Sequence, residues 1–201
     1  MASWWSITVP PEFQDVTAQA MTDPAFQASL DEIGKSAGTV DAQFWSSETS
    51  VILALDSRFG DMPNSLAVLE GFENGARTST YGSGKEHSYR VDKDGYFLIS
   101  HQHATNSAGE AMWTQRWTGR GTDGALHSLG VACTGDELGC KGVLAKVKVD
   151  PKSFVLQSDI PATTKSGRDV AYTIGYAVGG AMVLAFVLYA RAKARQRSRA
   201  A

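Results

Sequence analysis

The sequence is poor in the side chains from which metal sites and catalytic centres are commonly built. It has 201 residues but only four histidines and two cysteines. Cys133 and Cys140 stand in ACTGDELGC, a C-x6-C pair with no histidine nearby, so the four ligands typical of a zinc site are missing. The CxxC spacing of redox proteins is absent too. Two interpretations stay open. One is a disulfide, which would favour an oxidising compartment, and the other is two reduced cysteines packed as small apolar side chains.

Motifs of the common enzyme classes are missing or stand in the wrong context. The sequence contains no GxxxxGK[ST] phosphate loop. GxSxG occurs once, as GKSAG (34–38), between a predicted helix and a predicted strand, and GxGxxG occurs once, as GRGTDG (119–124), in a turn between two predicted strands. Neither has the strand-to-helix context of the corresponding enzyme motif. The segment YGSGKEHSY (81–89) does place glycines before a lysine. It precedes a predicted strand, however, whereas a phosphate loop leads into a helix. No residue is therefore singled out as catalytic, and we expect a non-enzymatic domain without a cofactor.

Positive charge is scarce outside the last residues of the chain. Five of the 19 basic residues lie in 191–201, which leaves 14 against 21 acidic residues in 1–190, a net charge of −7. Nucleic-acid binding needs basic groups to neutralise phosphates. The charge balance therefore argues against a nucleic-acid partner.

One long apolar run is present, VAYTIGYAVGGAMVLAFVLYA at 170–190, without charge or proline. As a helix its 21 residues would span roughly 30 Å, the thickness of a bilayer core. A buried core helix, the alternative, would usually show a polar stripe. Tyr172 and Tyr189 lie near the two ends, where aromatic rings favour the membrane interface. Gly175 and Gly179 have the spacing that lets two such helices pack closely. We expect a single transmembrane helix, with self-association through it as a further hypothesis.

The basic tail and the first residues of the chain predict opposite orientations in the membrane. The tail RAKARQRSRAA carries Arg191, Lys193 and Arg195 among its basic residues, which favours a cytoplasmic tail and could bind anionic lipids. By contrast, MASWWSITVPPEF (1–13) lacks the basic start, apolar core and cleavage site of a secretory signal. Export of the domain without such a signal is difficult. We therefore expect a tail-anchored protein with a cytoplasmic domain, although a disulfide would favour the other side.

Strand and helix patterns in the rest of the chain predict one α+β domain. Alternating or continuous apolar runs indicate strands at 5–9, 39–45 and 49–59, followed after residue 86 by four strands separated by Asp- and Gly-rich turns. Helical spacing follows capping signals at residues 23, 64 and 136. The expected fold is a mainly antiparallel sheet with helices packed on it. The expected organisation is a domain at 1–155, a linker at 156–169, the membrane helix at 170–190 and the tail at 191–201.

The order of these elements resembles the PsbP-like αβα sandwich superfamily. The resemblance is carried by an opening strand that ends in proline, SITVPPEFQDVT (6–17), by a helix before a long meander, and by the closing GVLAKVKVD (142–150). The superfamily includes the extrinsic subunit of photosystem II and small bacterial proteins. The resemblance implies an αβα sandwich and a non-enzymatic binding or adaptor role, with some bacterial members acting as chaperones for exported proteins. It transfers no site residue.

Histidines at alternate positions are the best metal candidate. His101 and His103 lie two apart on a predicted strand, so both imidazoles would point the same way. A site would need another ligand, for which Glu110, His87 and His127 are the candidates. The alternative is a pair of histidines on the solvent-facing side of the sheet.

Two tryptophans four apart would also share one face of their strand. Trp113 and Trp117 point one way and Arg116 between them the other. We expect them in the core. If they were exposed together, they would instead form an apolar patch suited to a protein partner.

Together these patterns favour a membrane-anchored, non-enzymatic interaction domain with a protein partner that the sequence does not identify. The alternative is a metal-binding protein or hydrolytic enzyme that uses His101 and His103 with a carboxylate. A concave pocket that pairs these histidines with an acidic residue would favour the alternative.

Overall fold

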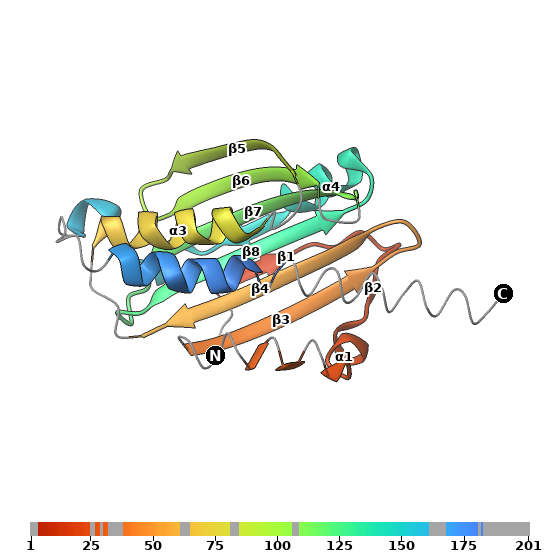
Figure 1. Cartoon of the computed structure of the whole chain (residues 1–201), viewed down its shortest axis with the longest axis horizontal. Helices are drawn as coiled ribbons and strands as arrows, with labels where there is room; N and C mark the ends of the chain where they lie inside the picture. The colour runs from red at the N-terminus through yellow and green to blue at the C-terminus, as the bar shows by residue number, and fades with distance from the viewer. Residues whose placement is uncertain are drawn as a thin grey trace.

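The computed structural model describes residues 4–24, 27–28, 30–31, 38–60, 65–80, 85–105, 109–160, 168–180 and 182. Within them, a seven-stranded antiparallel sheet has the order β2-β3-β4-β8-β7-β6-β5, and β1 pairs with β9 separately (Figure 1). The strands are β1 (Trp5–Ile7), β2 (Gln14–Asp15), β3 (Gly38–Ser46), β4 (Val51–Phe59), β5 (Lys85–Lys93), β6 (Leu98–Thr105), β7 (Ala111–Arg120), β8 (Leu126–Thr134) and β9 (Val147–Val149). The helices are α1 (Thr17–Ala20), α3 (Leu66–Thr80), α4 (Glu137–Leu144), two 3-10 turns (Pro151–Ser153 and Gln157–Asp159) and a C-terminal helix over residues 168–180.

The predicted fold class, α+β with a mainly antiparallel sheet, is confirmed. The four strands expected after residue 86 are β5 to β8, which pair with one another in chain order. The apolar run expected to be covered on both sides is β4, whose Ile52 and Leu53 point to opposite faces and are both fully buried. Alternating and continuous apolar runs therefore located these strands, whereas the short β2 and β9 were not predicted.

Helices cover both faces of the sheet and enclose two cores. One face is packed against α3 and the C-terminal helix, which lie side by side (Figure 1). The other face is packed against α4, β1 and β9. Trp113 and Trp117 belong to this second core and are only 8% and 6% exposed, so they form no exposed aromatic patch.

Residues 145–160, which follow α4, form a strand and two 3-10 turns and contribute side chains to the core. The predicted helix after Asp136 ends at Leu144, because the alternating VKV that follows pairs as β9 with β1. Phe154 and Ile160 are buried in the two cores. Part of the predicted linker therefore belongs to the packed domain, whereas residues 161–167 and much of the helix predicted after Asp23 lie outside the described residues.

The first half of the predicted membrane helix packs against α3. Ala171 and Val178, which were expected to face lipid, are buried in the first core. A side chain at Gly175 would overlap the backbone of Phe72, so the two helices touch through their main chains. The sequence reasoning missed this contact because a small, apolar helix face suits a neighbouring glycine-containing helix as well as lipid.

Among the described residues, no helix combines the length and the apolar character that crossing a bilayer requires. Tyr189, Arg191, Lys193 and Arg195 lie outside the described residues. Tyr172 is described and lies on the exposed side of the C-terminal helix, where its ring stacks against that of Tyr176.

Candidate functional site

A cleft of about 490 Å³ lies between strands β5 to β7 and helix α4. The strands provide its floor and α4 provides one wall. The cleft contains hydroxyl, guanidinium, imidazole, indole, amide, carboxylate and ammonium groups within a small volume. The side chains that supply them are Ser88, Arg90, His101, His103, Trp113, Gln115, Glu137 and Lys141.

The register of the sheet aligns these side chains in two rows. His103 of β6 lies opposite Ser88 of β5 and Trp113 of β7. His101, two residues earlier, lies opposite Arg90 and Gln115. Directly opposed residues of antiparallel strands point to the same face, so both rows line the cleft. The prediction that the two imidazoles point the same way is confirmed.

His103 is held by aromatic neighbours on both sides. Its ring stacks on that of Trp113 with centroids 4.8 Å apart and planes 5° from parallel. The His87 ring lies 4.9 Å away on the other side and forms a hydrogen bond with Thr105. Burial, and then the neighbouring His87, lower the pKa of His103. The imidazole is therefore neutral at neutral pH, with one nitrogen that donates a hydrogen bond and one that accepts.

His101 contacts a carboxylate on the edge strand. Its Nε2 lies 3.2 Å from Oδ2 of Asp92, which also accepts a 2.8 Å ion pair from Arg90. Burial and then Arg90 lower the pKa of His101, and Asp92 opposes this shift only in part. His101 is thus a neutral imidazole oriented by a carboxylate.

Helix α4 is fixed over the sheet by a disulfide and a helix cap. Cys133 at the end of β8 is bonded to Cys140 of α4, with Cα atoms 5.4 Å apart. Oδ2 of Asp136 accepts a 2.8 Å hydrogen bond from the Gly139 amide, which caps the helix. These two connections set the position of the wall that faces His103.

Charged groups on the wall form a pair of their own. Lys141 and Glu137, one turn apart on α4, form an ion pair. The hydrogen bond from Lys141 lowers the pKa of Glu137, so this carboxylate is ionised at neutral pH. Neither residue was singled out by the sequence, because only the packing of α4 on β7 and β8 brings them to the cleft.

The candidate metal ligands named from the sequence are not brought together among the described residues. Glu110 is exposed and does not line the cleft. His127 lies elsewhere, where its Nε2 is 3.1 Å from Asp123. In the described part of the chain, no three His, Cys, Asp or Glu side chains come close enough together to hold a metal ion.

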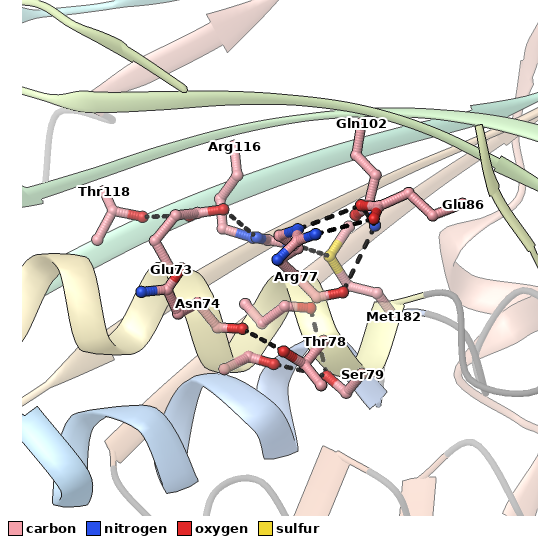
Figure 2. A network of polar contacts seen from close by, with 12 residues as sticks. Glu73, Asn74, Arg77, Thr78, Ser79, Glu86, Gln102, Arg116, Thr118 and Met182 are labelled. Carbon is pink, nitrogen blue, oxygen red and sulfur yellow. Dashed lines mark hydrogen bonds and ion pairs between the residues drawn. The ribbon is translucent and has the colours of Figure 1, made fainter. Parts of the chain in front are cut away.

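A buried polar network on the opposite face of the sheet was not predicted. Arg116 of β7 points toward α3, as the alternation implied, and its Nη1 lies 2.8 Å from Oε1 of Glu73 (Figure 2). The hydroxyl of Thr118 donates a 3.3 Å hydrogen bond to the other Glu73 oxygen. Both ends of the ion pair are almost fully buried, at 1% and 2% exposure. The alternation placed Arg116 on the face opposite Trp113 and Trp117, but it did not indicate that α3 covers this face.

The network continues along α3 toward the edge of the sheet. Arg77 donates to both carboxylate oxygens of Glu86, and Gln102 donates a 3.1 Å hydrogen bond to one of them (Figure 2). The Arg77 guanidinium also lies 4.5 Å from the centre of the Tyr89 ring. Polar groups thus pair with one another beneath the two helices, on the face of the sheet opposite the cleft.

Neither the protein-family models nor the curated proteins include a match to the sequence.

Proposed function

We propose that this chain is a membrane-associated, non-enzymatic binding module that holds a segment of a partner polypeptide in the cleft between β5, β6, β7 and α4. The observation that carries the proposal is the mixture of hydrogen-bond donors and acceptors beside an aromatic stack in one concave site. Recognition sites commonly combine an apolar surface with a few fixed polar groups in this way.

Charge in and around the cleft is balanced, which supports an uncharged ligand. Arg90 is paired with Asp92, and Lys141 is paired with Glu137. The two imidazoles that line the floor are neutral at neutral pH. A strongly anionic ligand would therefore have to break existing ion pairs, whereas the amide groups of a polypeptide can bind without doing so.

Strand β5 supports an extended polypeptide as the ligand. It lies at the end of the sheet, and in the described part of the chain no strand pairs with its outer side. An edge strand can receive a further strand through backbone hydrogen bonds, while side-chain pockets beside it provide specificity. His101 and His103 lie one strand in from this edge.

Membrane association is supported by the apolar run 170–190 and by the basic tail that follows it. The redox state of Cys133 and Cys140 bears on which side the domain occupies. A disulfide such as theirs persists in oxidising compartments, which supports a domain facing away from the cytoplasm. Labelling the cysteines in intact cells with a membrane-impermeant thiol reagent, with and without prior reduction, distinguishes this orientation from a cytoplasmic domain.

Two glutamines on one row of the sheet provide a matched test of the cleft. Gln115 lines the cleft. Gln43 lies on the same cross-strand row, separated from Gln115 by Val131 and Ala54, and is exposed outside the cleft. Peptides are selected from a random displayed library on the full chain in detergent. Gln115→Ala is expected to raise their Kd by roughly 2- to 12-fold, the loss of about one hydrogen bond. Gln43→Ala is expected to leave Kd unchanged. Selection of no peptide, or equal effects of both substitutions, would contradict the proposal.

Acid–base catalysis is a second candidate function, and the contact between His101 and Asp92 is the observation that favours it. A carboxylate that orients a neutral imidazole is a common feature of general bases. Turnover of an ester or peptide substrate that is lost in His101→Asn, with the selected peptides still bound, would favour this candidate over the binding module.

A further inference from the structure

The contact between α3 and the C-terminal helix is made by glycines of both helices. Each helix has two glycines four residues apart, and a Cβ atom at any of them would overlap the backbone of the other helix. At Gly75 it would strike the carbonyl of Tyr172, and at Gly179 the carbonyl of Ala76. We call this contact the glycine interface, formed by Gly71 and Gly75 of α3 and Gly175 and Gly179 of the C-terminal helix.

Side chains beside the glycine interface divide the C-terminal helix into two faces. Ala171, Val178 and Met182 are buried in the first core, with Met182 against Gly130 of β8. On the other side, Val170 and Tyr176 are 55% and 51% exposed. In water the docked position is favoured because it buries one apolar face. The opposite face nevertheless remains in contact with solvent.

The docked residues are the same residues that membrane insertion would need. A helix needs about 20 apolar residues to cross a bilayer core, so a span must use nearly all of 170–190. When residues 170–180 lie against α3, too few of that run remain. Docking on α3 and spanning the membrane therefore exclude each other.

We infer that the C-terminal helix has two alternative partners, the glycine interface of α3 and a lipid bilayer, and that it must leave α3 before it inserts. This inference rests on the membrane association proposed above. Residues 170–180 reach the membrane packed against their own domain, and the bilayer competes with α3 for this part of the helix.

Neighbouring glycines allow the inference to be tested at constant hydropathy. Gly179→Leu places a side chain against the α3 backbone, whereas a Cβ at Gly180 meets only the Ser79 Cβ at 3.9 Å. The full chain, wild type or variant, is mixed with vesicles of phosphatidylcholine and phosphatidylglycerol, and the carbonate-resistant fraction is measured. Because overpacking of this kind opposes docking, Gly179→Leu is expected to raise the ratio of inserted to extractable protein on the order of tenfold above Gly180→Leu.

A second substitution keeps the test independent of the apolar run. Gly75→Ala in α3 leaves residues 170–190 unchanged, and its control is Gly142→Ala in α4, where a Cβ meets nothing within 4 Å. Gly75→Ala is expected to raise the carbonate-resistant fraction, whereas Gly142→Ala is expected to leave it unchanged. Circular dichroism verifies that both variants fold.

The outcomes distinguish a failure of this inference from a failure of the proposed membrane association. Equal insertion of Gly179→Leu and Gly180→Leu would overturn the inference and leave membrane association standing. No insertion by the wild type or any variant would overturn both.

Discussion

Arg116→Met removes the cationic half of an ion pair buried between β7 and α3. The Glu73 carboxylate, which is 2% exposed, would lose its cationic partner and keep the hydrogen bond from the Thr118 hydroxyl. Breaking a buried pair by removing one partner typically costs about 3–5 kcal/mol, because a charge is left in a medium of low dielectric. Since domains unfold with only about 5–15 kcal/mol, this is a large part of the total stability.

We expect a different result for the double variant Glu73→Leu/Arg116→Met. Removing both charges removes the desolvation cost together with the attraction, so the free energy of unfolding should stay near the wild-type value or rise by about 1–4 kcal/mol. The two substitutions should therefore be strongly non-additive.

Urea unfolding at 25 °C, followed by circular dichroism, measures both effects. If the free energy of unfolding falls by about 2 kcal/mol per molar urea, Arg116→Met should lower the urea midpoint of unfolding by about 2 M. The double variant should not lower it. Arg58→Met provides the control, because the ion pair of Arg58 with Asp123 is 50% and 38% exposed. Its loss should cost less than about 1 kcal/mol. A cost of similar size for Arg116→Met, or a double variant as unstable as the single one, would refute this reasoning.

Three further predictions concern the cleft. Burial holds the pKa values of His101 and His103 below 6.5 in the folded state, so the unfolded chain binds more protons in mild acid. In urea unfolding, the free energy of unfolding should decrease as the pH is lowered from 7 to 5. The decrease should be smaller in the double variant His101→Gln/His103→Gln. Replacing Cys133 and Cys140 by serine should cost about 2.5 kcal/mol in the same assay, the chain-entropy value for so short a loop. Asp136→Ala removes the N-cap of α4 and should lower the free energy of unfolding by about 1 kcal/mol, which is measured as a lower thermal midpoint.

The sheet was predictable from the sequence because its signals are local. The alternation in β6 places His101 and His103 on one face and Gln102 on the other, and this needs no knowledge of the neighbouring strands. Turn residues between β5 and β8 mark where each strand ends. Helix α3 could likewise be located from the spacing of Leu69 and Phe72, both of which are buried.

The partners of these elements were not predictable, because they depend on contacts far apart in the chain. The run at 170–190 satisfies every rule for a membrane helix, yet its Gly175 lies against Phe72 of α3. The glycines of GFENG (71–75) were the missing signal, since they have the same spacing. Glu110 was one candidate ligand beside His101 and His103, but Asp92 and Glu137 are acidic residues that lie near these histidines.

Strand pairing also has a consequence for how the chain folds during synthesis. β1 finds its partner only when β9, with residues Val147–Val149, has been made. β4 likewise waits for β8, although its residues are buried on both faces in the finished sheet. An emerging polypeptide therefore carries the β3–β4 hairpin with an uncovered apolar edge until the ribosome has produced some 75 further residues, a period in which such edges attract other chains.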